Sequence, residues 1–321
     1  MIRVTDRTLS CLDKFDVSGE ELRDFAQLLV LIGVDWIEMS EKAFKLMGKL
    51  PEGGKYVLRL KNEADSIAYR DFDRFVCRNT HNDINDNMCT EIILNDIHER
   101  YIFARYHGYK SVRICGLYDL MLANYESAFR QIHESFNGFV ELCPTNHSFC
   151  ATAIAAEWIS SGGRDVVTSF GGIGGFAATE EIILHLKLQR VRKVGKTYPE
   201  FPKIRCLLES VTGLPFALNK PILGEHIFVV ESGIHVDGII KQPKCYEPFP
   251  PKTVGQSRRF TLSKQSSTAS IHLKLSELGI SIPQKQIPEL LLSVKKKSIE
   301  ANKSISDEEF IGLVRETATS I

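Results

Sequence analysis

The sequence has no excess of charge of either sign and no long apolar run. Its 40 Lys and Arg residues balance its 40 Asp and Glu residues, so no global field would attract nucleic acid or an anionic membrane surface. The longest apolar stretch, Phe25 to Val34, contains Gln27 and is too short to span a bilayer. The segment from Met1 to Asp6 lacks the apolar core of a signal peptide. These absences argue against the nucleic-acid-binding and membrane-spanning classes.

The sequence also lacks paired cysteines. Its eight cysteines are scattered, and none forms a C-x-x-C pair. In a chain of 321 residues, this pattern predicts reduced thiols and a cytoplasmic protein. The composition, 43% hydrophobic and 25% charged, excludes a disordered or fibrous chain. The length predicts two domains, or one barrel with an appendage, and an enzyme or enzyme subunit is the class that fits.

The first two thirds of the chain alternate short apolar runs with amphipathic stretches. Ser18 caps the first predicted helix, acidic Glu20 and Glu21 occupy its first turn, and Gly33 ends it. Strands that alternate with helices in this way predict βαβ units and a parallel sheet. The predicted strands are residues 3–8, 34–39, 56–60, 74–78, 112–115, 139–142 and 166–170.

Seven strands leave two architectures open, because a closed (β/α)8 barrel needs eight. The chain is either an open sheet or a barrel that is one strand short. The stretch from His81 to Asn87 is polar and turn-like, and a strand would be missing there. Immediately after it, a helical face is predicted by the spacing of Ile92, Ile93, Ile97, Tyr101 and Ala104.

The composition changes after residue 188. Residues 189–203 are basic and contain proline, as linkers do. Helix is predicted over 204–211, and three more helices over 266–278, 287–301 and 307–318. Ser306 and Glu309 form a capping box for the last of these. The predicted domains are therefore residues 1–200, barrel-like, and residues 201–321, mainly helical.

Candidate functional residues lie where the predicted strands end, because α/β proteins place their active sites at the C-terminal ends of parallel strands. The segment from Gly172 to Ala177 fits the dinucleotide pattern G-x-G-x-x-A. It comes late in the chain, and no strand that ends in an acid follows it, so a tight turn is favoured over nicotinamide binding. These strand ends carry Asp6, Glu38, Asn79, Cys115, Cys143 to His147 and Gly171 to Gly175.

Thiol and imidazole groups leave further alternatives open. Cys11, taken as the end of the first strand, could join Cys143 and His147 in a zinc site, although the spacing is no known metal signature. Cys143 could also be a nucleophile with His147 as its base, but a buried structural cysteine is the simpler interpretation. The polar segment from Thr80 to Asp83 is typical of a solvated loop.

The densest cluster of polar residues and glycines runs from Glu231 to Ile239. Within it, His235 lies between two glycines and apolar neighbours, a pattern that predicts a side chain held in a defined turn. Tyr246 follows eleven residues later. A His/Tyr pair that reaches one pocket can act as base and proton donor, whereas the alternative is a purely structural histidine.

This cluster, together with Tyr246-Glu247-Pro248 and Val254-Gly255, resembles homocitrate and isopropylmalate synthases. Members of that family are metal-using (β/α)8 enzymes that condense acetyl-CoA with a 2-oxo acid and carry helical subdomains after the barrel. Asp6 to Leu9 is similar to the family's opening D-T-T-L-R-D-G, and Trp36 to Glu38 to its second strand. The resemblance implies a degenerate barrel followed by a mainly helical C-terminal subdomain.

The barrel departs from the family where the chemistry lies. The family's catalytic arginine and metal-binding aspartate fall at Ser10 and Cys11, and its H-x-H metal ligands fall at Cys143 and Thr145. The glycine loop is shorter and lacks the family's glutamate and asparagine. Loss of a carboxylate and two imidazoles removes the ligands of a divalent metal. The resemblance therefore implies no metal in this chain and no condensation by this chain alone.

The resemblance does keep the residues that the family places in trans. In the family, the residues that match His235 and Tyr246 reach the active site of a partner chain, where the histidine helps to deprotonate the acetyl group. The chain is thus similar to the omega-type chains of two-chain homocitrate synthases of nitrogen-fixing bacteria. That similarity implies acetyl-CoA and 2-oxoglutarate as substrates, a metal-bearing partner chain, and homocitrate for the nitrogenase iron–molybdenum cofactor. The alternatives are a self-sufficient condensing enzyme with a cysteine-containing metal site and a non-catalytic regulatory protein.

Overall fold

The computed structural model describes the chain except for residues 79, 81–85, 119, 123, 192–196, 320 and 321. Two compact units make up the chain. The first comprises Met1–Lys196 and Glu200–Phe216, and the second Thr197–Pro199 and Ala217–Ile321. The roles predicted for residues 1–200 and 201–321 stay predictions. In the described residues, no helix is long and apolar enough to cross a membrane.

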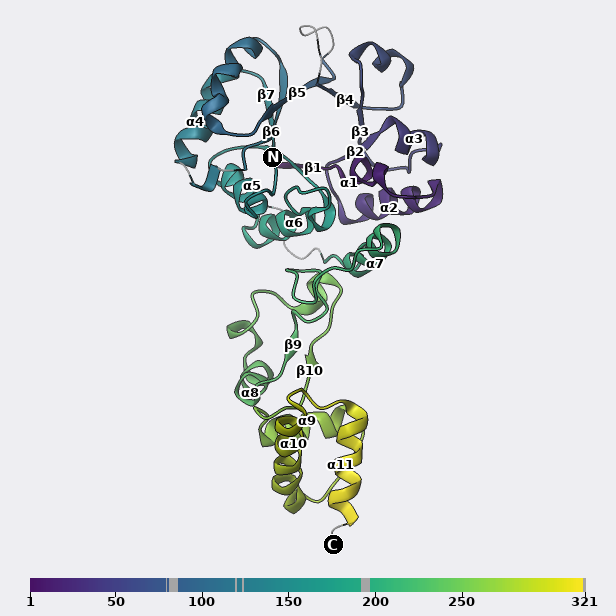
Figure 1. Cartoon of the computed structure of the whole chain (residues 1–321), viewed down its shortest axis with the longest axis vertical. Helices are drawn as coiled ribbons and strands as arrows, with labels where there is room; N and C mark the ends of the chain where they lie inside the picture. The colour runs from purple at the N-terminus through teal and green to yellow at the C-terminus, as the bar shows by residue number, and fades with distance from the viewer. Residues whose placement is uncertain (79, 81–85, 119, 123, 192–196, 320–321) are drawn as a thin grey trace. The chain divides into compact units, whose positions relative to one another are not determined.

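The first unit is a closed barrel of parallel strands, each paired with its neighbours in chain order and the last with the first (Figure 1). Its strands are β1 (Arg3–Asp6), β2 (Trp36–Ser40), β3 (Tyr56–Arg59), β4 (Arg74–Cys77), β5 (Met88–Leu94), β6 (Ser111–Gly116), β7 (Phe139–Pro144) and β8 (Asp165–Thr168). The predicted barrel fold is confirmed, and the open sheet is excluded. Its closure leaves no exposed strand edge.

The expectation of a missing strand was wrong. β5 fills the gap, pairing with β4 at Cys89 and with β6 from Thr90 to Leu94. Ile92 and Ile93 therefore lie on a strand, and only η3 (Ile97–Tyr106) follows as a 3-10 helix. The apolar spacing over these residues fits a helix by coincidence, because a short strand buried on both faces shows no clear two-residue alternation. Of the loop that was predicted before it, residues 81–85 lie outside the described part of the chain.

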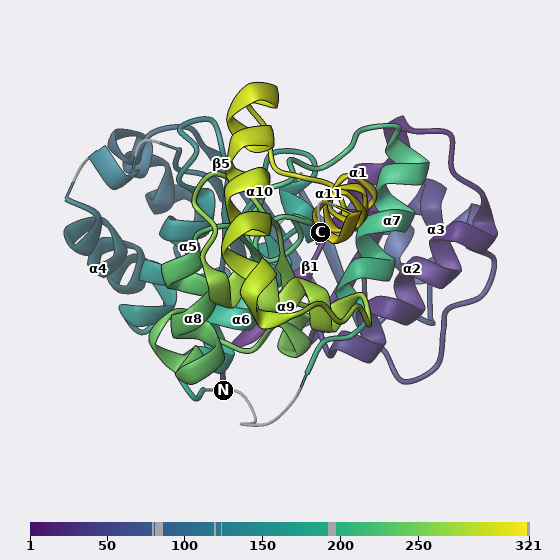
Figure 2. The same ribbon diagram turned by 90° about the horizontal axis from the view of Figure 1, so that it is seen from below.

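Helices surround this barrel and bury their apolar faces against it. The predicted start and stop of α2 (Gly19–Ile32) are confirmed, since Ser18 and Glu21 form a capping box and Gly33 adopts a left-handed conformation. α7 (Phe201–Thr212) packs beside α2 (Figures 1 and 2). The other helices of the unit are α1 (Thr8–Cys11), η1 (Leu12–Lys14), α3 (Glu41–Met47), η2 (Glu63–Ala68), η4 (Leu120–Leu122), α4 (Tyr125–Ser135), α5 (Ala151–Ser160), η5 (Phe170–Gly172) and α6 (Thr179–Leu188).

The second unit is mainly helical, as predicted. A short parallel pair, β9 (Val229–Val230) with β10 (Arg259–Phe260), precedes a helical core that includes Leu290 and Phe310, both fully buried. The capping box of Ser306 and Glu309 is present at the start of the last helix. The helices of this unit are α8 (Gly233–Lys241), η6 (Pro243–Cys245), η7 (Pro251–Val254), α9 (Thr268–Glu277), η8 (Gln284–Gln286), α10 (Ile287–Ala301) and α11 (Asp307–Thr319).

Candidate functional site

The interior of the barrel holds a buried network of arginines and glutamates. Glu91, Arg113 and Glu141 are register partners on β5, β6 and β7. Arg113 is fully buried, and its Nε donates to Glu141 Oε2 at 2.7 Å while Nη1 donates to Glu38 Oε2. Arg59 donates to Glu38 Oε1 at 2.9 Å and to both carboxylate oxygens of Glu91. Each buried acid is thus matched by at least two guanidinium groups, the pairing that makes burial of these charges tolerable.

This network keeps its acids ionised. Burial alone would raise the pKa of Glu38, but Arg113, Arg59 and Arg7 outweigh it and hold that pKa well below its usual range. Burial also opposes ionisation of Glu91, yet its hydrogen bonds from Arg59 lower its pKa to about 2. The barrel interior therefore contains a network of ion-paired arginines and ionised glutamates.

Arg7, which follows β1 directly, takes a distinctive place above this network. Its guanidinium carbon lies 4.0 Å from the centre of the Phe176 ring, and its Nη1 lies 3.3 Å from Cys143 Sγ and 4.0 Å from Cys115 Sγ. Its side chain is 9% exposed, and its Nε lies 3.8 Å from Glu38 Oε1 without a hydrogen-bond partner. Arg7 is a residue of the site that was not predicted from the sequence. A cationic side chain directly after a strand was the available signal.

The two thiols beside Arg7 interact with each other. Cys115 and Cys143 are register partners on β6 and β7. Burial opposes ionisation of Cys143, but a hydrogen bond from Cys115 and the charge of Arg7 outweigh it and lower the pKa of Cys143 to about 7. The same hydrogen bond, with burial, raises the pKa of Cys115. The charge of Arg7 therefore favours the thiolate form of Cys143.

The structure does not assemble the candidate zinc site. Cys11 lies in α1 and not at the end of the first strand, which is Asp6. His147 is exposed and contacts Thr145 Oγ1 at 3.2 Å, whereas Cys143 is fully buried. Within the described residues, no three His, Cys, Asp or Glu side chains are placed to hold a metal ion. Glycine at 174 is required by packing, because a Cβ there would lie 2.8 Å from Cys11 Sγ.

The second unit brings His235 and Tyr246 together. Their ring centroids are 5.8 Å apart, with the ring planes at 59°. Gly238 makes this possible, since a Cβ at that position would lie 2.2 Å from the tyrosine ring. His235 is exposed on α8, and Tyr246 is 45% exposed just after η6. The expectation of a turn around His235 was wrong: the segment is helical, although Gly233 and Gly238 disfavour helix in isolation.

Comparisons with known proteins show what this chain is similar to. A profile described as "Homocitrate synthase post-HMGL domain-like" matches residues 222–302, the segment that carries the His/Tyr pair. The omega subunit of homocitrate synthase from Clostridium pasteurianum is 29% identical over 98% of this chain and 95% of that protein. Over nearly its whole length, the chain is therefore similar to homocitrate and isopropylmalate synthases.

Other relatives carry related names. The 2-isopropylmalate synthase 2 of Caldanaerobacter subterraneus is 27% identical over 86% of the chain and 71% of that protein. Homocitrate synthase AksA of Methanocaldococcus jannaschii is 37% identical over 48% of the chain, but that match spans only 39% of its own length. Among solved structures, the HMG-CoA lyases of Bacillus subtilis and Pseudomonas aeruginosa have TM-scores of 0.53 and 0.52 at 14% and 13% identity. They cover 67% and 66% of this chain, and 95% and 93% of theirs, a likeness of fold.

The divalent metal that the family resemblance implies does not fit the residues of this barrel. The positions of the motif's aspartate and two histidines are taken by Cys11, Cys143 and Thr145. These leave no carboxylate or imidazole for a hard or borderline cation. In addition, the guanidinium of Arg7 lies against Cys143, where a second cation would be repelled.

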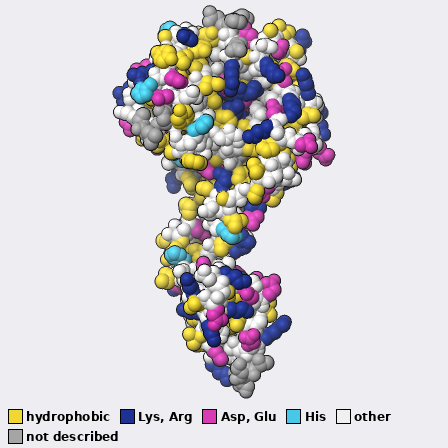
Figure 3. Space-filling model, viewed as in Figure 1, with side chains coloured by type: hydrophobic (Ala, Val, Ile, Leu, Met, Phe, Trp, Pro, Cys, Tyr) yellow, Lys and Arg dark blue, Asp and Glu magenta, His cyan; other side chains and the backbone are white. Residues whose placement is uncertain are grey.

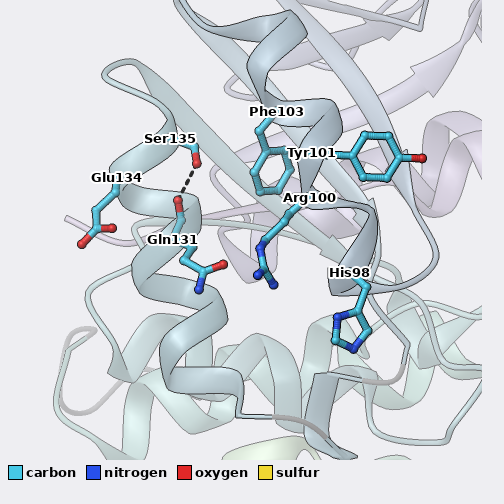
Figure 4. A pocket seen from close by; sticks show the side chains of 7 residues that line it. All are labelled: His98, Arg100, Tyr101, Phe103, Gln131, Glu134 and Ser135. Atoms are coloured by element: carbon cyan, nitrogen blue, oxygen red, sulfur yellow. Dashed lines mark hydrogen bonds between the residues drawn. The ribbon is translucent and has the colours of Figure 1, made fainter.

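The described residues of the barrel unit line a larger and a smaller cavity. The larger, about 1080 Å³, opens where β1 to β4 end; its lining includes Arg7, Lys42, Lys45, Arg59, Lys61 and Arg78. Lys and Arg side chains gather around β3 and β4 on the face shown in Figure 3. The smaller, about 490 Å³, lies between η3 and α4; its lining includes His98, Tyr101 and Glu134 (Figure 4). The smaller cavity contains none of the predicted site residues.

Proposed function

We propose that this chain is a subunit of a homocitrate synthase that supplies His235 and Tyr246 to the active site of a metal-bearing partner chain. The observation that carries the proposal is an exposed, preformed His/Tyr pair in a chain whose own barrel does not fit the metal. The similarity to an omega subunit supports the same proposal.

In the proposed reaction, His235 removes a proton from the methyl carbon of acetyl-CoA. The resulting carbanion attacks the C2 carbonyl of 2-oxoglutarate, a carbon–carbon bond forms, and Tyr246 supplies a proton toward the new alkoxide. Water then cleaves the thioester, releasing CoA and homocitrate. A metal in the partner would polarise the 2-oxo carbonyl when bound. A neutral imidazole has one ring nitrogen that can accept this proton and later release it.

The surface around the pair supports docking onto a protein partner. α8 also exposes two large apolar side chains, Ile234 at 78% and Ile240 at 54%. Exposed aliphatic groups around a half-exposed tyrosine are typical of the buried centre of an interface. Assembly with a partner would bury these groups and exclude water from His235.

The test is thiol release from acetyl-CoA and 2-oxoglutarate by the chain alone and with an intact-barrel partner, in the presence of a divalent metal. We expect turnover only from the mixture. His235→Ala should lower the rate of the complex by about 100-fold or more, the usual worth of a general base. His272→Ala, an exposed histidine on α9, is the matched control and should leave the rate unchanged.

Gel filtration of each variant with the partner separates loss of catalysis from loss of docking. Full activity of a properly assembled His235→Ala complex would refute the trans assignment. Turnover by the chain alone at roughly 1 per second would instead favour a self-sufficient enzyme. An active partner whose rate does not depend on this chain would favour a regulatory protein.

A further inference from the structure

Arg7 places a guanidinium cation in the part of the barrel where the family binds a divalent metal ion. The motif D-T-T-L-R-D has threonine where this chain has Arg7, so the arginine is itself a departure from the family pattern. It stands beside Cys143, which takes the place of a metal-binding histidine. The chain has therefore lost the ligands of a divalent ion and gained a permanent positive charge in the same part of the barrel.

The residues around Arg7 fix the position of its guanidinium but do not satisfy all of its hydrogen-bond donors. Phe176 covers one face of the guanidinium at 4.0 Å, and Cys143 approaches an edge. Glu38 is its nearest carboxylate, at 3.8 Å from Nε, but Glu38 is already engaged by Arg59 and Arg113. Nε is buried without a hydrogen-bond partner. An unsatisfied buried donor on a charged group is costly, and a ligand that interacts with this guanidinium would offset that cost.

The cavity next to Arg7 carries an excess of positive charge. Six cationic side chains line it, against the three acids Asp13, Glu41 and Asp65. These acids accept hydrogen bonds from Ser40, Tyr69 and Asn62, and none of them pairs with a rim lysine. Arg59 and Arg78 are already paired with Glu38 and Glu91, so the positive charge left for a ligand is carried by Arg7 and the three lysines. Lys42 donates to a backbone carbonyl, and Lys45 and Lys61 are exposed. A cleft with low-dielectric walls and charge of one sign concentrates ions of the opposite sign.

We infer that the mouth of this barrel is a metal-free binding site for a small organic polyanion, with Arg7 as the fixed cation at its base and the rim lysines as further contacts. The cavity of about 1080 Å³ accepts a molecule of metabolite size or larger. The charges can be carboxylates or phosphates, because a lysine ammonium recognises either as a point charge. Without a Lewis acid to polarise it, the bound anion is held and not converted.

The inference is tested on the full chain without any partner or turnover, so its failure is distinguishable from failure of the proposed function. The chain is incubated with excess Mg²⁺, Mn²⁺ or Zn²⁺, desalted, and analysed for metal. It is then titrated calorimetrically, with and without chelator, using citrate, coenzyme A and inorganic phosphate as separate probes. We expect no retained metal and chelator-insensitive binding of an organic probe. Citrate binding identifies carboxylates as the recognised groups, and coenzyme A binding identifies phosphates.

Three variants connect binding to the named residues. Arg7→Met keeps the side chain's length but removes its charge, and should weaken binding about tenfold or more, the loss of a charge-assisted contact. The double variant Lys45→Met/Lys61→Met should also weaken binding and keeps the test decisive if Arg7→Met does not fold. Lys296→Met, an exposed lysine on α10, is the matched control and should bind as the parent does.

Four results with the parent chain would overturn the inference. They are retention of about one metal ion per chain, anion binding that requires added metal, no organic probe bound with a Kd below roughly 10 mM, and binding of inorganic phosphate as tight as that of either organic probe. If folded Arg7→Met or the lysine double variant binds the organic probe as tightly as the parent chain does, these residues do not belong to the site. That result would also refute the inference.

Discussion

Replacing Arg113 with methionine should destabilise the barrel strongly at neutral pH. The guanidinium is fully buried and donates to both Glu38 and Glu141. Its removal takes one guanidinium partner from each of the buried carboxylates of Glu38 and Glu141. Arg59 still reaches Glu38, and Arg74 still reaches Glu141 at 2.8 Å. Breaking a buried pair by removing one partner costs about 3–5 kcal/mol. We expect a loss of about 3 kcal/mol in the free energy of unfolding at pH 7.

The penalty should depend on pH in a defined direction. In the parent chain, burial opposes ionisation of Glu141, but Arg113 and Arg74 outweigh it and lower its pKa. A lowered folded-state pKa gives stability that is present above the unfolded pKa and lost as pH falls through the folded one. Without Arg113, burial dominates and raises the pKa of Glu141, so acidification relieves the uncompensated charge. The difference in the free energy of unfolding between Arg113→Met and the parent chain should therefore become smaller as the pH falls from 7 to 4.

Urea denaturation followed by tryptophan fluorescence measures this effect in the barrel alone. The two tryptophans of the chain, Trp36 and Trp158, both belong to the barrel unit. With a slope of about 3 kcal/mol per molar urea, the expected loss moves the midpoint by about 1 M. Arg130→Met, an exposed arginine on α4, is the matched control and should change the free energy by no more than about 0.5 kcal/mol. A loss below about 1 kcal/mol for Arg113→Met, or a gap unchanged by pH, would refute the reasoning.

Two further predictions concern the thiol pair and the His/Tyr pair. In the parent chain, the absorbance of the Cys143 thiolate near 240 nm should titrate with a midpoint near 7. In Arg7→Met the midpoint should be clearly higher, because the guanidinium that favours the thiolate is gone. An unchanged midpoint would contradict this role of Arg7. Gly238→Ala should lower the rate of the reconstituted complex by about tenfold or more, because its Cβ would displace the Tyr246 ring. Gly312→Ala in α11, where a Cβ meets no neighbouring atom within 4 Å, should keep the rate and gain about 0.5–1 kcal/mol of stability; equal activity in both glycine variants would count against the His/Tyr geometry.

Helix starts and ends could be predicted from the sequence because the interactions that define them involve residues of the same turn. Ser18 with Glu21, and Ser306 with Glu309, satisfy backbone donors of their own first turns, so four residues are enough to predict these helix starts. α10 begins and ends at the predicted residues, since a proline in its first turn and a left-handed Asn302 after its last define its limits. The alternation of elements was likewise enough to predict a parallel sheet.

Features that depend on distant residues could not be predicted in the same way. β5 is a strand because β4 and β6 lie on either side of it, whatever the spacing of its isoleucines. α8 is helical despite its two glycines because the Tyr246 ring and Ser267 pack closely against them. Arg7 is seen as an interior cation only when the barrel closes and brings Cys143, far away in the sequence, against it.

The position of Arg7 also limits how this barrel could change by single substitutions. At about 4 Å and an effective dielectric constant of about 20, its charge would repel a divalent ion by about 8 kcal/mol. Restoring an aspartate at Cys11 or a histidine at Cys143 would therefore give no metal affinity while the arginine is present. Removing Arg7 first would leave the Cys143 thiolate without the guanidinium that lies against it. Reversion to a metal-binding barrel thus requires several simultaneous changes, and each single step along the way is disfavoured.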